Sequence, residues 1–133
     1  MDYCKILKDA ETIAVVGISS DPTKTSRKIA RYLVAAGYNV VGVNPLVNAD
    51  EVDSIKIYKN LIDIPHAVDI IDVFRKSEHI KDVLDDVLSI KPKVFWLQLG
   101  IINDEVIDTV KAAGIVGIQN RCIYVEHNNC KNK

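Results

Sequence analysis

The chain has 133 residues, of which 48% are hydrophobic and 26% are charged, and its formal net charge is −1. This length fits one domain with its own core, and the composition is typical of a globular protein. A near-neutral chain projects no strong field toward nucleic acid or a membrane surface, so we expect neither partner, and an anion site would need a local cluster of basic residues.

Short apolar runs alternate with longer amphipathic segments in the first half of the chain. The run 12–18 is continuous and largely β-branched, as in a strand buried on both faces of a sheet. Residues 26–36 carry apolar side chains at helical spacing and end before Gly37, which predicts a helix. Residues 39–43 then form the second predicted strand, which Asn44-Pro45 terminates.

The same alternation continues to the last strand. Segment 46–68 is irregular, and within it only residues 56–58 suggest a strand. Strands are predicted at 69–74, 94–99 and 115–118, and helices from a Ser77 N-cap to about Ile90 and from Asn103 or Asp104 to Ala113. We expect the tail 127–133 to fray. The pattern predicts an α/β, Rossmann-like, doubly wound and mainly parallel sheet.

The N-terminus and the cysteines indicate the cytosol. No apolar signal segment follows Met1, and the longest apolar runs are too short to span a bilayer. The three cysteines, at positions 4, 122 and 130, include no Cys-x-x-Cys pair, which argues against a disulfide framework and a thiolate metal site. We therefore predict one cytoplasmic domain over residues 1–133, with a core at about 12–126.

The turn after the first predicted strand, residues 17–22, is the predicted pyrophosphate site. At such a turn, the amides and the positive dipole end of the following helix meet an anion. Of the Gly-x-Gly-x-x-Gly dinucleotide fingerprint, Gly17 remains, whereas Ser19 and Pro22 replace the other two glycines. The hydroxyls of Ser19 and Ser20 can donate to phosphate oxygens, although the backbone approaches a ligand less closely than glycine allows.

A basic cluster follows this turn and consists of Lys24, Arg27, Lys28 and Arg31. Lys24 and Arg27 lie nearest the turn and favour a ligand with more than one phosphate group. For Lys28 and Arg31, the solvated face of a surface helix is an equal alternative.

The residues at the end of the second predicted strand help to distinguish which nucleotide the chain would bind. An NAD-binding domain places Asp or Glu there to hold the ribose 2′-hydroxyl. This chain has Val43-Asn44-Pro45 and no carboxylate before Asp50. NAD is therefore disfavoured, while NADP or a 3′-phosphorylated adenosine stays open.

Six segments in order resemble the CoA-binding domain family, and the resemblance covers residues 12–126. The family includes the N-terminal domain of succinyl-CoA synthetase alpha subunits and small stand-alone YccU-like proteins. The segments are Val15-Val16-Gly17-Ile18-Ser19, Gly37-Tyr38, Val43-Asn44-Pro45, Asp72-Val73-Phe74-Arg75, Trp96-Leu97-Gln98-Leu99-Gly100 and Asn120-Arg121-Cys122.

The resemblance implies a Rossmann-like domain that binds coenzyme A at its strand ends. The first turn and the residues after it would contact the phosphates, Asn44 and Pro45 would border the adenosine, and Phe74-Arg75 would form a loop over the ligand. Arg75 can pair with a phosphate bidentately, the alternative being an ion pair with Glu78. The implied cofactor-binding residues are Gly17, Ile18, Ser19, Ser20, Lys24, Ser26, Arg27, Val43, Asn44, Pro45, Phe74 and Arg75.

The chain departs from the family between the second strand and Tyr58. Relatives carry a glycine shortly before the Tyr58 position, whereas this chain reads Val52-Asp53-Ser54-Ile55. The departure concerns the adenine-side wall of the site and leaves the first turn unchanged.

We find no catalytic constellation and no metal site in the sequence. His66, His79 and His127 have no metal-ligand spacing and suit surface or capping roles. Cys122 follows Arg121, which favours its thiolate, so a mixed disulfide with the CoA thiol is one hypothesis and a buried apolar role the other. The sequence thus predicts a non-catalytic protein that binds CoA or acyl-CoA and that can form a homodimer. The alternatives are an NADP-binding oxidoreductase-type module and a nucleotide-sensing regulatory protein.

Overall fold

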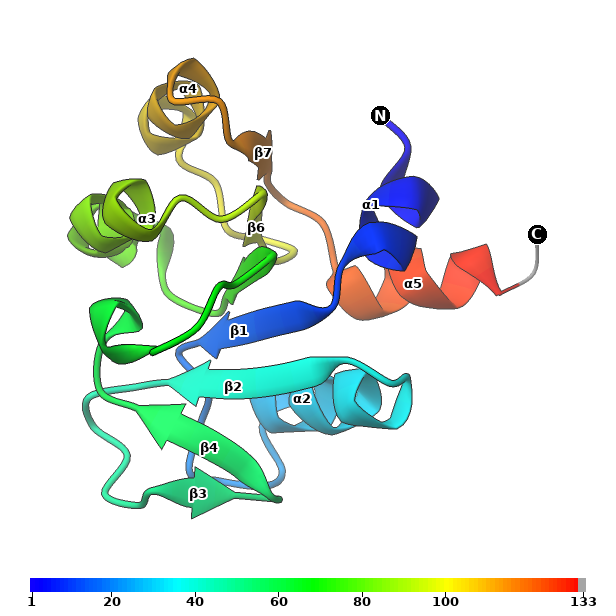
Figure 1. Ribbon diagram of the computed structural model, residues 1–133, viewed down its shortest axis with the longest axis vertical. Coiled ribbons are helices and arrows are strands. Elements are labelled where there is room, and N and C mark those ends of the chain that lie inside the picture. The colour runs from blue at the N-terminus through cyan, green and yellow to red at the C-terminus, as the bar shows by residue number, and fades with distance from the viewer. Residues whose placement is uncertain (132–133) are drawn as a thin grey trace.

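The computed structural model describes residues 1–131 and contains one seven-stranded sheet (Figure 1). The strand order is β3-β4-β2-β1-β5-β6-β7, and every neighbouring pair is parallel except the β3–β4 hairpin. The strands are β1 (Thr12–Val16), β2 (Asn39–Val43), β3 (Glu51–Val52), β4 (Ile55–Tyr58), β5 (Ile70–Val73), β6 (Val94–Leu97) and β7 (Val116–Ile118). The predicted α/β fold class is confirmed.

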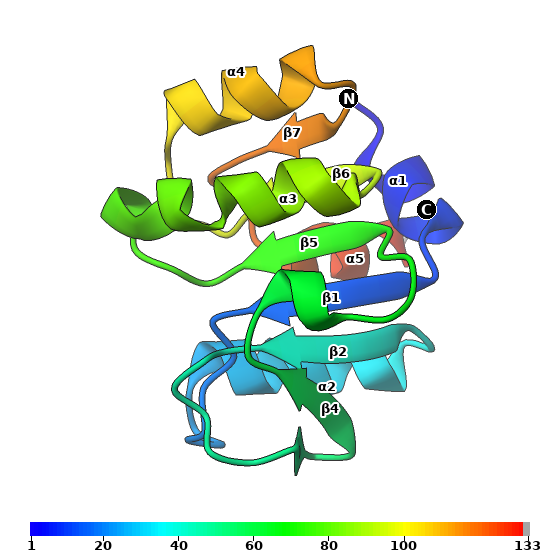
Figure 2. The ribbon, with the colours of Figure 1, turned by 60° about the vertical axis from the view of Figure 1, so that its left-hand side comes forward.

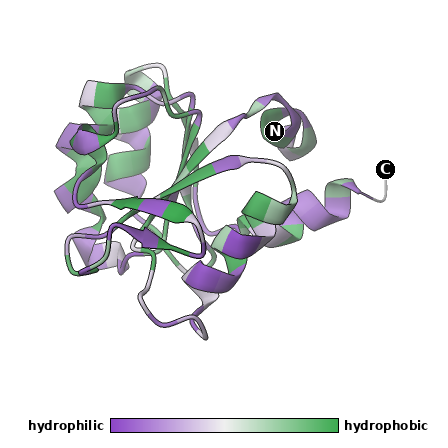
Figure 3. Ribbon diagram, turned by 60° about the horizontal axis from the view of Figure 1, so that its bottom comes forward, coloured by the Kyte–Doolittle hydropathy of each residue, from purple (hydrophilic) through white to green (hydrophobic). Residues whose placement is uncertain are grey.

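Helices cover both faces of this sheet, as Figures 1 and 2 show. On one face lie α3 and α4, and on the other lie α1, α2 and α5. The α-helices are α1 (Tyr3–Asp9), α2 (Thr25–Ala35), α3 (Leu84–Ile90), α4 (Asp104–Ala112) and α5 (Ile123–Cys130), and the 3₁₀ segments are η1 (Leu61–Asp63) and η2 (Ser77–Val83). Hydrophobic and hydrophilic residues alternate along the outer helices (Figure 3), and α2 and α4 bury their apolar side chains against the sheet. None of the helices in residues 1–131 is long and apolar enough to cross a membrane.

The sequence-based boundaries agree with most elements and differ at several places. The segment after Ser77 is 3₁₀ as far as Val83 and becomes α-helical only from Leu84. The helices α1 and α5 and the short strand β3 had no counterpart in the prediction. The tail was expected to fray from residue 127, but α5 continues to Cys130, while residues 132–133 lie outside the described part. The terminal helices pack against each other and the sheet, and this tertiary packing supplies stability that short helices lack alone.

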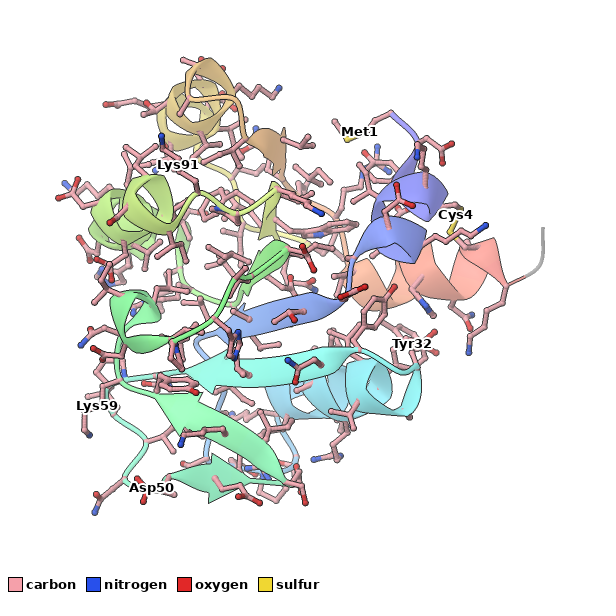
Figure 4. All side chains as sticks on the ribbon, in the orientation of Figure 1. Met1, Cys4, Tyr32, Asp50, Lys59 and Lys91 are labelled. Atoms are coloured by element: carbon pink, nitrogen blue, oxygen red, sulfur yellow. A yellow bond between two sulfur atoms is a disulfide. The ribbon has the colours of Figure 1, made fainter. Side chains whose placement is uncertain are left out.

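A disulfide joins the two terminal helices. Cys4 of α1 and Cys130 at the end of α5 are bonded although 126 positions separate them, and Cys122 is the free cysteine. Figure 4 shows Cys4 where α1 and α5 lie side by side. The expectation that the cysteines form no disulfide was wrong, because spacing along a chain does not reveal that its two ends meet in space.

One carboxyl group lies inside the core without a partner. Asp72 of β5 is fully buried between Val15 of β1 and Trp96 of β6, and neither of its oxygens has a hydrogen-bond partner. Burial raises the pKa of Asp72 well above its ordinary value, because desolvation disfavours the charged form. The folded protein therefore holds a proton that the unfolded chain releases near its ordinary pKa.

We predict that Asp72→Asn becomes more stabilising, relative to the wild type, as pH rises from 5 to 8. In the wild type, the free energy of unfolding is not reduced by Asp72 below about pH 4. Between that pH and the folded-state pKa of Asp72, it falls by at most about 1.4 kcal/mol per pH unit, because one proton is involved. Urea unfolding at each pH measures the difference. The exposed Asp108→Asn serves as a matched control and should keep the wild-type slope. Parallel slopes for all three proteins would contradict a buried titrating Asp72.

Candidate functional site

Two loops cross closely where the strand order reverses between β1 and β5. The amide of Gly17 donates to the Val43 carbonyl at 2.8 Å, and the amide of Phe74 donates to the Val16 carbonyl at 2.8 Å. Gly17 has φ +85°, and a Cβ there would collide with the Phe74 carbonyl oxygen and lie 3.3 Å from Cγ of Arg75. Only glycine therefore fits at this crossing.

The first turn is held by side chains of α2 and by its own polar residues. The Ser19 amide donates to Oγ of Ser26 at 3.0 Å, and Oγ of Ser19 accepts from the Asp21 amide at 3.0 Å. The Asp21 carboxylate in turn accepts from the amide and the hydroxyl of Thr23. At the start of α2, Lys24 occupies the N-cap position and makes no side-chain cap bond. The first amides of the helix therefore have no capping side chain and can meet an anion.

The buried side chain of Arg27 is hydrogen-bonded to the backbone of the first turn. Its side chain is 7% exposed, and its Nη1 donates to the carbonyls of Ser19 at 3.2 Å and Ser20 at 2.8 Å. Its Nε and Nη2 donate to Oδ2 of Asp53 at 3.0 and 2.8 Å. The guanidinium is thus occupied by protein acceptors, and this position was expected from sequence to contact phosphate. The structure gives Arg27 a role in shaping the turn.

Asp53 comes from the segment 46–68 that the sequence left irregular. Asp53 and Ser54 have φ +51° and +64° and form the two-residue turn of the β3–β4 hairpin. Asp53 also accepts from Nη1 of Arg31 at 3.1 Å, and these hydrogen bonds from Arg27 and Arg31 lower the pKa of its carboxyl. Sequence reasoning missed this residue, since a carboxylate in an irregular segment gives no sign of a partner 26 residues away.

Asn44 links the end of β2 to the first turn. Its Nδ2 donates to the Ile18 carbonyl at 2.8 Å, and its Oδ1 accepts from the Leu46 amide at 2.9 Å. The side chain of Ile18 is fully buried, so its contribution to this edge is its carbonyl. An amide therefore occupies the position where a ribose-binding carboxylate is expected in NAD-binding domains.

A cleft of about 430 Å³ opens beside the crossing of the two loops. Five predicted residues line it, namely Gly17, Asn44, Pro45, Phe74 and Arg75, together with Leu46, Lys76 and His79. Val43 lines a second cavity of about 90 Å³ next to it, which Pro45 and Arg75 also border. The other predicted residues belong to the first turn and the start of α2 and line neither cavity; they are Ile18, Ser19, Ser20, Lys24, Ser26 and Arg27.

Several residues that line these cavities were not predicted from the sequence. Leu46 is 89% exposed at the cleft, and Lys76 and His79 lie just after the predicted Phe74-Arg75 loop. Lys59 and Asn60 line the smaller cavity, and Figure 4 shows Lys59 just after β4. Proximity to Arg75 in the chain was an available signal for Lys76 and His79. No such signal existed for Lys59.

The basic side chains at the cleft differ in whether a carboxylate lies near them. Arg75 is half-buried and pairs with no carboxylate in the part of the chain that the structure describes, so the predicted alternative of an ion pair with Glu78 does not form. His79 lies 3.8 Å from Glu78 and 3.6 Å from Asp82. The cleft therefore presents the cations of Arg75 and Lys76 to a ligand.

The remaining candidates for chemistry lie away from the cleft. Cys122 is half-buried against the core below α5, and Nδ1 of His127 shares a hydrogen bond with the Tyr32 hydroxyl at 2.7 Å. Gln98 accepts from the Ile123 amide through its side-chain oxygen. His66 is exposed. Across residues 1–131, no three His, Cys, Asp or Glu side chains gather in a way that could hold a metal ion.

Comparison with known proteins gives consistent matches over most of the chain. Residues 11–128 match the family model described as a CoA binding domain. The protein YneT of Bacillus subtilis (strain 168) is 37% identical over 123 residues, which are 92% of this chain and 90% of YneT.

Solved structures match as well. The structure of cell-free ID.343 from Thermus thermophilus has a TM-score of 0.91 and 38% identity, over 95% of this chain and 94% of that one. A dinucleotide-forming acetyl-coenzyme A synthetase 1 of Ca. Korarchaeum cryptofilum, solved with phosphate and ADP, has a TM-score of 0.77 and 27% identity. That match covers 90% of this chain and 28% of the synthetase, so the fold also occurs as one part of a longer enzyme.

We predict that Gly17→Ala destabilises the protein more than Gly114→Ala does. Both glycines have φ +85°, but a Cβ at Gly114 meets no atom within 4 Å, whereas at Gly17 it meets the Phe74 carbonyl. Both variants carry the cost of a left-handed alanine, on the order of 1 kcal/mol, and Gly17→Ala adds a steric cost of about 1–3 kcal/mol. Urea unfolding measures both. Equal losses of stability in the two variants would show that the first turn and the Phe74-Arg75 loop can move apart at no energetic cost.

Proposed function

The chain belongs to the CoA-binding domain family, and from this we propose that it binds coenzyme A or an acyl-CoA at the carboxyl edge of its sheet, without catalysing a reaction on the ligand. The observation that carries the proposal is the placement of Arg75. Arg75 lines the 430 Å³ cleft and has no carboxylate partner among the described residues, and its Cγ lies at the crossing of the first turn and the Phe74-Arg75 loop. An unpaired cation in this position suits a phosphate group.

In this proposal, the twelve predicted residues divide into two groups by what they touch. One group would face the ligand and comprises Gly17, Ser19, Ser20, Lys24, Asn44, Pro45, Phe74 and Arg75. The other group is buried and holds the turn in shape; it comprises Ile18, Ser26, Arg27 and Val43. The uncapped amides of α2 and the hydroxyls of Ser19 and Ser20 would receive the pyrophosphate, and Arg75 with Lys76 would approach a further phosphate.

The absence of catalysis is proposed from the lining of the cleft. The eight described residues that line it include no serine or cysteine beside a base, and His79 lies between two carboxylates on the protein surface. Nucleophilic catalysis needs a nucleophile within hydrogen-bonding reach of a base. A protein of this kind would carry or sense CoA. The cytosolic location and the association of two copies stay predictions from the sequence.

An NADP-binding module is the second candidate, and Asn44 is the observation in its favour. The amide of Asn44 stands at the end of β2, where it would neither repel a 2′-phosphate nor hold the ribose hydroxyls as a carboxylate does. The two candidates differ in the ligand that binds, so titration separates them.

We predict that isothermal titration ranks CoA above dephospho-CoA, with NAD weakest. The 3′-phosphate of CoA adds charge-assisted hydrogen bonds that dephospho-CoA lacks, each contributing about 1.5–3 kcal/mol. NADP is the comparison ligand for the second candidate. Tight binding of NADP or NAD without binding of CoA would overturn the proposed function.

We predict that Arg75→Ala weakens CoA binding by about 1–3 kcal/mol, because the variant removes a cation that has no other partner in the cleft. Lys111→Ala is the matched control, since Lys111 is an exposed cation on α4 that lines neither cavity. Circular dichroism of both variants checks that the fold is retained. An unchanged affinity of Arg75→Ala for CoA would show that Arg75 does not contact the ligand.

A further inference from the structure

The face of the sheet under α1 and α5 contains the unpartnered carboxyl of Asp72. Side chains alternate along a strand, so Asp72 shares this face with Ile70. Ile70 and Trp96 belong to one apolar cluster with Leu7 of α1 and Ile123 of α5. Figure 2 shows α5 behind β5 and β1, with α1 next to it. The two terminal helices, together with α2, therefore cover the side of the sheet on which the carboxyl lies.

The helices α1 and α5 are short, and a few hydrogen bonds and one disulfide hold them in place. Helices of seven and eight residues have little stability of their own in water. The start of α5 is tied to β6, because Trp96 Nε1 donates to the Arg121 carbonyl at 2.8 Å and the Ile123 amide donates to Gln98 at 3.1 Å. At the far end, the disulfide between Cys4 and Cys130 joins α5 to α1 covalently.

We propose that the Cys4–Cys130 disulfide and Asp72 together form a redox- and pH-dependent latch on α1 and α5. With the disulfide formed, the two helices stay on the sheet. With it reduced, they open locally, and opening becomes more frequent as pH rises, because the open state allows Asp72 to ionise in water. The latch concerns the terminal helices and is independent of what the cleft binds.

Reduction requires a dithiol as co-reactant. One thiolate of the dithiol attacks a sulfur of the Cys4–Cys130 bond, which forms a mixed disulfide and releases the other cysteine as a thiolate that takes up a proton. The second thiolate of the reductant then displaces the remaining cysteine. Two electrons pass to the protein, two cysteine thiols form, and the dithiol becomes a disulfide. Both cysteines are partly exposed, so the bond is open to attack.

The groups around Asp72 give the carboxylate no cation in the closed state. Arg27 is bonded to Asp53 and to the turn, and Arg121 lies 3.6 Å from Glu126 and over the ring of Tyr3. Burial lowers the pKa of His127, which favours its neutral form. The titratable and charged groups on the elements packed here are Tyr3 on α1, Arg27 and Tyr32 on α2, Tyr38 before β2, Arg121 and Cys122 before α5, and Glu126 and His127 on α5.

The direction of the pH dependence follows from this lack of partners. In the closed state Asp72 keeps its proton, whereas in the open state water restores an ordinary carboxyl pKa of about 4. Opening therefore releases a proton, so its equilibrium constant rises up to tenfold per pH unit, from above about pH 4 to the closed-state pKa of Asp72.

Hydrogen–deuterium exchange of the full chain tests the latch. Peptides covering α1 and α5 are followed at each pH unit from 5 to 8, oxidised and after dithiothreitol, with rates corrected for intrinsic exchange, and α4 peptides report global unfolding. We expect flat protection of α1 and α5 in the oxidised protein. In the reduced protein we expect protection there to fall up to tenfold per pH unit while α4 is unchanged. Equal protection in the two redox states would overturn the latch.

Two variants separate its parts. Cys130→Ser should show the exchange of the reduced protein without a reductant. Asp72→Asn, reduced, should lose the pH dependence of α5 exchange, whereas reduced Asp108→Asn should keep it. A pH dependence that persists in Asp72→Asn would assign it to another group and overturn the role of Asp72. Should Asp72→Asn fail to fold, the wild-type series decides alone, because a pH-independent reduced protein excludes the latch.

Discussion

The buried guanidinium of Arg27 is the contact on which the carboxyl edge of the sheet depends. It joins the first turn, through the Ser19 and Ser20 carbonyls, and the helix α2 that carries it to the β3–β4 hairpin, which lies 26 residues further along the chain and is bonded through Asp53. A buried charge is stable only when it is paired and hydrogen-bonded, and Arg27 meets both conditions. The turn can therefore hold its shape with serine and proline at two positions where dinucleotide-binding turns have glycine.

Local patterns predicted the elements well wherever burial alone decides them. The continuous apolar runs of β1, β2, β5 and β6 and the helical spacing of α2 and α4 are visible in the sequence, and the strand–helix alternation gave the parallel sheet. The terminal helices were not predicted, because α1 and α5 are stabilised by each other and by the disulfide. Pairing between residues 4 and 130 leaves no trace in either local segment.

The candidate site was predictable to the extent that it depends on chain position at the strand ends. Gly17, Asn44, Pro45, Phe74 and Arg75 follow β1, β2 and β5, and the topology brings them to one cleft. What each side chain bonds to was not predictable. Arg27 was predicted to contact phosphate and Arg31 was left open between a ligand role and a solvated helix face, yet both bond to Asp53 in the segment that the sequence left irregular.

The cross-links among the loops have a consequence for the entropy of binding. Gly17 is bonded to β2, Asn44 to the first turn, and the turn to α2 and the hairpin, so the loops at this edge are fixed to one another before any ligand arrives. A binding surface that is already ordered loses little conformational freedom on association. If the cleft binds as proposed, its affinity for each ligand would reflect the contacts that the ligand makes, with little contribution from reorganisation of the protein.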